Sequence, residues 1–351
     1  ASAAANDGDN IEDRLTRANR ERSEQGSGEV ELSYGGEEDL KHHFKACQKN
    51  PGHLEFFSVD QFTIHCLPSR YQDDDLLDFI RALSNLTVRV TVTKVSDKRP
   101  KTYPGTDETY PCYSDRGNSL LRTGTGWVSG VRKRTGTKGT SGCTCRECRW
   151  SAEAERTFAY IDINTTSIVV FDDIEGVYTS CDLFFDKDTT LSECQDVITL
   201  SGMSSVKSDI TSNTCLMTYV THDMALAERL LNMCQQNQTA HKVLMDKYSN
   251  DRDSRISSSF RPGFLPEPEH SLTVIVSHPH GRSKQISVGG YTKRETIKTI
   301  WSQYTYSTAT CPGSSGALVY VLGNSKLVVD HAHVGCRGSV NKLGYSSYGV
   351  D

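Results

Sequence analysis

The stretch that decides the fold is Thr310-Cys311-Pro312-Gly313-Ser314-Ser315-Gly316-Ala317-Leu318-Val319-Tyr320-Val321, a Pro-Gly turn that runs into an apolar strand. Its two glycines permit backbone conformations in which a side chain would clash. Such a turn can aim two backbone N–H groups at one point, beside the hydroxyl of Ser315. An oxyanion hole next to a nucleophile is built in this way. We therefore take Ser315 as a candidate nucleophile, with the N–H groups of Gly313 and Ser315 as a candidate oxyanion hole.

The composition narrows the class of protein. The chain has 351 residues, 36% of them hydrophobic, and a formal net charge of -5. This charge gives no electrostatic reason to expect a nucleic acid partner. No run approaches the roughly 18 to 20 apolar residues of a membrane span. Twelve cysteines are too sparse for a small disulfide scaffold, so we lean towards an intracellular location and leave the compartment open.

The N-terminal third predicts a tail and a small extension. Residues 1–38 are polar and charged and read as a disordered tail or a marginal helix. Residues 39–110 predict an α+β extension, because an apolar helix with an acidic N-terminus at 73–83 precedes an alternating strand at 87–93. We expect this extension to pack as a cap on the main domain.

The rest of the chain predicts two β units joined by a helix. Residues 111–222 and 271–351 contain short strands separated by glycine-rich turns. Residues 223–270 between them carry apolar residues at helical spacing to about Tyr248, followed by a Pro-rich loop.

Four features of these units occur in the order found in trypsin-like (chymotrypsin-fold) serine peptidases. They are the Gly-x-Gly-aromatic-Val strand Gly124–Val128, the segment Ile168–Phe171, the His-Pro-His-Gly turn His278–Gly281, and the serine turn Cys311–Val319. Over about residues 115–345 the chain therefore resembles a divergent member of this family. The resemblance implies a mainly β fold of two six-stranded antiparallel β-barrels, with the site in the cleft between them. It also implies a polypeptide substrate or peptide ligand and no required cofactor.

Two positions of the catalytic triad differ from the family pattern. In the matching register the histidine position is Ile168 and the aspartate position is Asn213, with Asp209 as a substitute if the register differs. Isoleucine has no lone pair and cannot accept the serine proton. Loss of a triad histidine costs about a millionfold in turnover. Two interpretations stay open: a pseudopeptidase with little or no activity, or a serine endopeptidase that uses Ser315 with an unidentified base.

Three further histidines have expected roles. The His-x-Gly at His333 resembles the glutamyl-specific branch of the family, in which a histidine contacts an acidic or amide side chain of the substrate. The alternatives for His333 are an exposed strand histidine or a partner of Cys336. We expect His278 and His280 to be structural members of their turn.

A cysteine cluster predicts a structural zinc. Cys143, Cys145 and Cys148 lie within six residues of a Gly/Thr-rich loop, and three thiols so close can converge on one tetrahedral ion. The alternatives are one disulfide with a spare thiol, or three free thiols. A zinc-stabilised peptide-binding or scaffolding module is therefore a third interpretation. We expect His222 to cap or pack on the helix that follows it. Candidates for a fourth ligand are Cys112, Cys181, Cys194, His331, His333 and Cys336.

Overall fold

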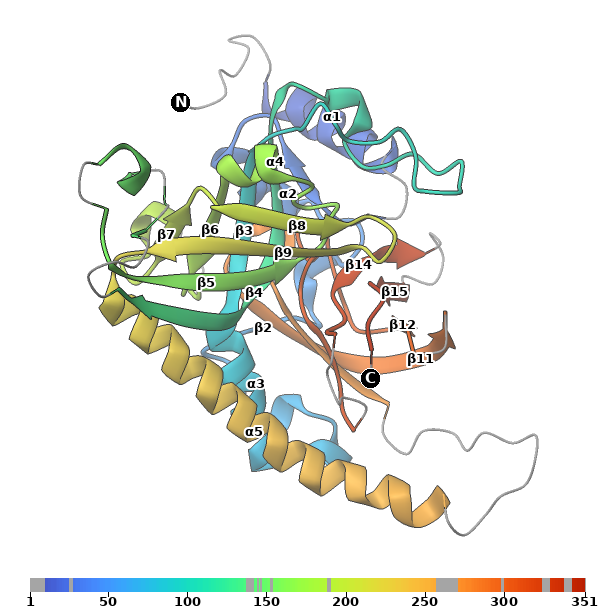
Figure 1. Ribbon diagram of the computed structural model, residues 1–351. Helices are drawn as coiled ribbons and strands as arrows, with labels where there is room; N and C mark the ends of the chain where they lie inside the picture. Colours follow the sequence, from blue (N-terminus) through green and yellow to red (C-terminus); the bar gives the residue numbers. More distant parts are fainter. Residues whose placement is uncertain are drawn as a thin grey trace.

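The computed structural model describes residues 10–24, 28–136, 142–143, 145, 147–151, 154–187, 191–256, 271–297, 300–323, 329–337 and 343–350. Strands dominate this part of the chain and form two antiparallel sheets (Figure 1). The mainly β fold class with two antiparallel units is therefore confirmed. The Pro-rich loop expected before the second unit, residues 257–270, lies outside the described residues.

The first sheet is built around β4 (Ser119–Thr135), the strand with the expected Gly-x-Gly-aromatic-Val sequence. Alternating apolar side chains of its neighbouring strands fill one continuous core. The strand order is β7 (Ile198–Ser201), β6 (Thr179–Leu183), β3 (Thr87–Lys94), β4, β5 (Thr157–Thr165), β9 (Thr214–Thr221) and β8 (Ser205–Asp209), with β1 (Glu31–Ser33) also paired to β4.

The second sheet follows the linker helix and carries the serine turn. The turn lies directly before β13, and the loop after it leads into β14. The strand order is β13 (Val319–Val321), β10 (Leu272–Ser277), β11 (Gln285–Thr296), β12 (Ser302–Tyr306), β15 (Leu343–Ser346) and β14 (His333–Arg337), with β2 (Phe57–Ser58) paired to β11.

The N-terminal region differs from the sequence-based expectation. Where the structure describes residues 1–38, they include α1 (Ile11–Glu24), in line with the helix alternative, and the buried strand β1, which neither alternative foresaw. The boundary at residue 110 is also wrong, since β3 pairs with both β4 and β6 inside the first sheet. The burial of β1 was not expected because Glu31 is a charged residue. In the structure Glu31 is fully buried, and its carboxylate contacts two imidazoles. A sequence reading counts such a residue as solvated.

Two helices pack against each other on the outside of the sheets (Figure 1). The longer one, α5 (Met224–Ile256), is the expected inter-barrel helix and continues beyond Tyr248. The Asp223 carboxylate caps its start by accepting the Leu226 N–H (2.9 Å). The shorter one is α3 (Asp74–Leu86), capped by Asp73. The other helices are α2 (Glu37–Lys45) and α4 (Asp173–Val177), and one-turn 3₁₀ helices lie at Pro51–His53, Ile64–Cys66, Ser69–Tyr71, Tyr113–Asp115, Cys148–Trp150, Leu191–Glu193 and Pro279–Gly281.

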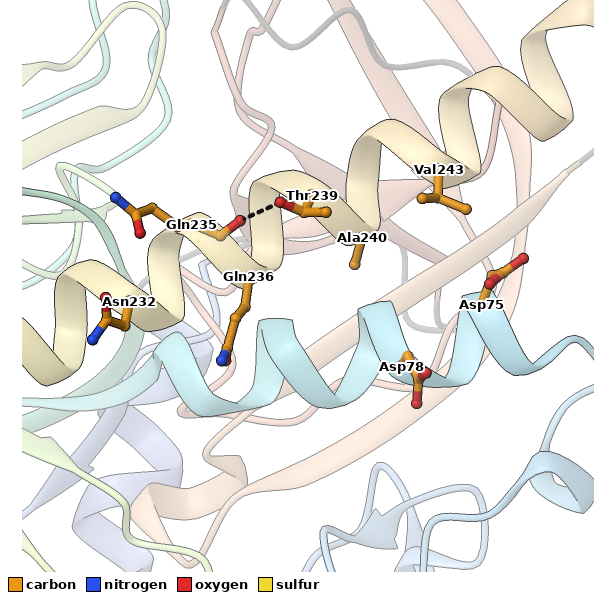
Figure 2. Close-up of a pocket in the computed structure, with 8 residues that line it drawn as sticks. All are labelled: Asp75, Asp78, Asn232, Gln235, Gln236, Thr239, Ala240 and Val243. Atoms are coloured by element: carbon orange, nitrogen blue, oxygen red, sulfur yellow. Dashed lines mark hydrogen bonds between the residues drawn. The ribbon is translucent and has the colours of Figure 1, made fainter.

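A groove runs between α3 and α5. Figure 2 shows it between Asp75 and Asp78 on one helix and polar residues such as Gln236 and Thr239 on the other. None of the residues expected to act in catalysis lines this groove. Among the described residues, no helix combines the length and the apolar character that crossing a membrane would require.

Candidate functional site

The serine turn has the tight backbone that its glycines predict. Gly313 and Gly316 have φ values of +95° and +92°, in the left-handed region that disfavours a side chain. A Cβ at Gly316 would lie 2.0 Å from the Thr125 carbonyl oxygen, and one at Gly313 would lie 2.6 Å from the carbonyl oxygen of His278. The Thr125 N–H donates to the Ser315 carbonyl (2.8 Å), so β4 of the first sheet holds the turn of the second. Ser315 is fully buried there.

The N–H groups of the expected oxyanion hole bind a carbonyl oxygen of the chain itself. Gly313 and Ser315 donate their backbone N–H groups to the carbonyl oxygen of Glu29, at 2.8 and 3.4 Å. The Glu29 N–H in turn donates to the Val334 carbonyl (3.2 Å), and Gly28 forms an antiparallel bridge with Gly335. Residues 28–29 thus pair with the start of β14 through one isolated β-bridge and one backbone hydrogen bond.

The Glu29 side chain enters a buried pocket beside the turn. Its Oε2 contacts His333 Nε2 (2.8 Å) and accepts the hydroxyl of Thr310 (2.8 Å), and its Oε1 accepts the Lys49 ammonium. Burial alone would raise the pKa of Glu29, but Lys49 and His333 together hold it well below its usual range. The pocket therefore holds a glutamate carboxylate in its ionised form.

His333 contributes to this pocket as a neutral donor. Burial lowers its pKa, although the Glu29 carboxylate opposes that shift. Tyr306 lies on the other side of the ring, with its hydroxyl 2.6 Å from His333 Nδ1. Burial raises the pKa of Tyr306 far above the ordinary range, so its hydroxyl keeps its proton and donates to Nδ1. The remaining ring proton is then on Nε2, which donates to Glu29.

The hydroxyl of Ser315 contacts backbone groups. It donates to the Val334 carbonyl (2.6 Å) and accepts the Glu29 N–H (3.1 Å). Among the described residues, no imidazole is a hydrogen-bond partner of this hydroxyl. The arrangement orients Ser315 but gives it no group that could take its proton.

Ile168 and Asn213, the residues predicted at the other triad positions, both have partners in the first β unit. A Cβ at Gly28 would lie 3.2 Å from the Ile168 side chain, so this buried isoleucine packs against the bound segment. Asn213 has a φ of 55°, and its side-chain oxygen accepts the Ser167 hydroxyl (3.4 Å). Asp209, the substitute considered for Asn213, accepts the N–H of Thr211 at the end of β8. Glu29, Lys49 and Thr310 were not identified from the sequence.

The cysteine loop meets a histidine that the sequence analysis assigned elsewhere. His222 Nε2 lies 3.3 Å from the sulfur of Cys143, 3.7 Å from that of Cys145 and 3.5 Å from that of Cys148. Tetrahedral zinc with bonds of about 2.3 Å to sulfur and 2.0 Å to nitrogen places such ligands about 3.5 Å apart. The four side chains therefore fit one zinc ion, and His222 takes the place of the six fourth-ligand candidates. It lies directly before α5, as expected, and its contact with the three sulfurs was not foreseen.

Comparisons with known proteins give distant likenesses. No family model matches the chain, and no curated protein matches it. Similar solved structures include an HtrA-type protease AlgW with a decapeptide (8% identity, 77% of this chain and 63% of that one, TM-score 0.34) and an inactive form of the Rv3671c protease (12%, 78% and 90%, 0.33). A thermostable serine protease, AL20, from an extremophilic microorganism is a third (10%, 76% and 92%, 0.34).

All three of these structures are proteases. The chain spans less than two thirds of the AlgW structure. At TM-scores below 0.5 the likeness transfers no site residue or activity, and the fold described above stands on its own strand pairings.

Proposed function

We propose that this protein is a pseudopeptidase: a serine-peptidase-like module that binds a glutamate-containing peptide segment and does not hydrolyse it. One observation carries the proposal. The Glu29 carbonyl oxygen accepts the N–H groups of Gly313 and Ser315, while the Ser315 hydroxyl contacts only backbone groups among its described partners. The turn thus has the groups that bind a peptide carbonyl, without the base that would make its serine a nucleophile.

The bound segment indicates what the site recognises. An extended backbone pairs with β14, and a carboxylate side chain fills the pocket of Lys49, Thr310 and His333. This is strand addition with a specificity pocket, a common mode of peptide recognition. The neighbouring AlgW structures contain a decapeptide and a tripeptide, and we propose peptides with a glutamate as the ligand class here. In the structure the chain's own residues 28–29 occupy the site.

Zinc at Cys143, Cys145, Cys148 and His222 is part of this proposal. Backbone N–H groups of Cys145 and Cys148 donate to the sulfurs of Cys143 and Cys145, at 3.3 and 3.4 Å, as expected around thiolates that bind a metal. The ion would hold the cysteine loop against the end of β9. Its role would be structural, because four protein ligands leave no open position for a substrate.

A fluorophosphonate probe tests the absence of activity, provided that the bound segment is also loosened. We expect no labelling of Ser315 in the native chain or in Glu29→Ala, which removes the side chain that anchors residues 28–29. Ser315→Ala in both backgrounds is the matched control. Labelling of Glu29→Ala that disappears in Glu29→Ala/Ser315→Ala would reveal a latent serine endopeptidase with an unidentified base, and the proposal would be wrong.

A further inference from the structure

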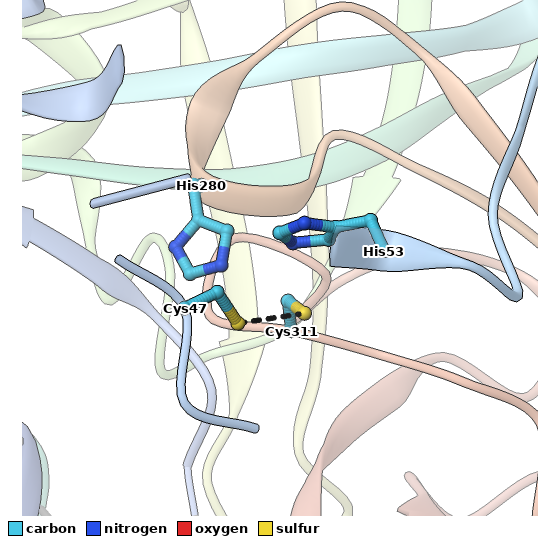
Figure 3. A group of neighbouring side chains, drawn as sticks. All are labelled: Cys47, His53, His280 and Cys311. Carbon is cyan, nitrogen blue, oxygen red and sulfur yellow. Dashed lines mark hydrogen bonds between the residues drawn. The ribbon is translucent and has the colours of Figure 1, made fainter. Parts of the chain in front are cut away.

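A second group of cysteines and histidines lies beside the serine turn. Cys47, His53, His280 and Cys311 are all buried, and one ligand atom from each lies within 4.8 Å of the others (Figure 3). Cys47 and His53 come from the N-terminal region, His280 comes from the His-Pro-His-Gly turn, and Cys311 opens the serine turn. Three segments that are distant in sequence therefore converge on one point.

The two sulfurs of this group are spaced as ligands of one metal ion. Cys47 Sγ and Cys311 Sγ are 3.6 Å apart. Two thiolates on a tetrahedral zinc, with bonds of about 2.3 Å, lie about 3.8 Å apart. A disulfide requires about 2.05 Å, and both cysteines are free in the structure. The separation thus matches shared coordination far better than a covalent bond.

The two imidazoles each have a nitrogen available for a metal. Nε2 of His53 and Nε2 of His280 are buried and have no hydrogen-bond partner within the described part of the chain. Such an unsatisfied buried polar atom costs about 1–3 kcal/mol, and coordination of a cation would remove that cost. Nδ1 of His280 contacts a Glu31 carboxylate oxygen (2.6 Å). A carboxylate on the second ring nitrogen is the usual partner of a metal-binding histidine, because it fixes the tautomer with Nε2 free.

The backbone around these ligands is held in unusual conformations. His53 and His280 have φ values of 49° and 52°, in the left-handed region that residues other than glycine rarely adopt. Strain of this kind persists where the surroundings enforce it, and it gathers at functional sites. Asn50 also donates its backbone N–H to Cys47 Sγ (3.4 Å) and its side-chain amide to Cys311 Sγ (3.1 Å). These donors stabilise sulfur in its anionic form.

We propose that Cys47, His53, His280 and Cys311 bind a second structural zinc ion. A tetrahedral set of two sulfurs and two nitrogens selects zinc among the common divalent metals. The ion fastens the N-terminal region to the start of the serine turn. Lys49 lies between two of the ligands and pairs with the carboxylate of Glu29, so the ion also fixes the cation of the glutamate pocket. This proposal does not depend on whether Ser315 reacts.

Metal content of the full chain tests the proposal. We expect two zinc ions per native chain by elemental analysis after purification in reductant without chelator. Cys47→Ser and Cys145→Ser should each retain one, and the double variant none. Cys66→Ser, which changes a cysteine of the same region outside both groups, should retain two. With cobalt in place of zinc, the site left in Cys145→Ser should show charge-transfer absorption from two thiolates, against three for the site left in Cys47→Ser.

Two results would overturn the proposal. One is a native chain with a single zinc that Cys145→Ser loses and Cys47→Ser keeps. The other is a peptide map without reduction that joins Cys47 to Cys311 in a disulfide. If Cys145→Ser fails to fold, the zinc content of the native chain still tests the proposal. Two ions per chain support it, and one ion contradicts it.

Discussion

Replacing Glu29 with glutamine should release residues 28–29 from the serine turn. The Glu29–Lys49 ion pair is largely buried, with 8% and 18% of the two side chains exposed. Removing one partner of a buried pair costs about 3–5 kcal/mol, because the other charge is left uncompensated. Glutamine can still accept the Thr310 hydroxyl, so we expect the lower value, about 3 kcal/mol. This corresponds to roughly a 150-fold larger population of the released segment.

Amide hydrogen exchange at Gly313 and Ser315 measures this release, since both N–H groups donate to the Glu29 carbonyl. We expect their exchange in Glu29→Gln to be about two orders of magnitude faster than in the native chain. Glu55→Gln, at an exposed position of the same region, is the control and should change neither rate. Adding Lys49→Met should restore part of the protection, because no buried ammonium is then left unpaired. Exchange in Glu29→Gln within about fivefold of the native rate would refute the reasoning.

Three further predictions concern pH, a buried charge and the turn itself. The pKa of Glu29 in the folded chain lies below the 4.5 of an exposed glutamate, so its contribution to stability is complete above that pH and is lost as the pH falls below it. In urea titrations, the difference in unfolding free energy between the native chain and Glu29→Gln should stay constant from about pH 6 to 8 and shrink below pH 4.5. A difference that grows in acid would contradict this. Glu175→Gln leaves two buried arginines without their carboxylate and should cost about 3–5 kcal/mol of unfolding free energy, whereas Glu228→Gln, which breaks an exposed pair, should cost at most about 1. Equal losses would count against the buried network. Gly316→Ala adds a Cβ 2.0 Å from a carbonyl oxygen of β4, while Gly105 has φ of +74° and open space around it. We expect Gly105→Ala to cost about 1 kcal/mol of unfolding free energy, and Gly316→Ala at least about 2 kcal/mol more in the same assay. Similar losses for the two variants would show that the turn can shift.

The fold class could be predicted because it depends on local patterns. Alternating strands such as β3, glycines at the serine turn and the apolar periodicity of α5 all lie within short windows of sequence. The cysteine loop was found for the same reason, since its three thiols lie within six residues. His222 was missed because its contact with the loop requires β5 and β9 to pair. A short window cannot show that pairing.

The occupant of the site could not be predicted from the sequence. Glu29 and His333 are 304 residues apart, and neither lies in a pattern that points to the other. Glu29 and Glu31 are also charged residues in a polar stretch, which composition assigns to solvent. Their burial follows from Lys49, His43 and His280, partners that only the folded chain brings together.

The pairing of Gly28 with Gly335 has a consequence for synthesis of the protein. At about 5–20 residues per second, the ribosome needs roughly 15 s to 1 min to make the chain between these two positions. Throughout that interval the Glu29 segment lacks the strand and the turn on which it finally rests. The strand and the serine turn therefore close around a segment that is made long before them.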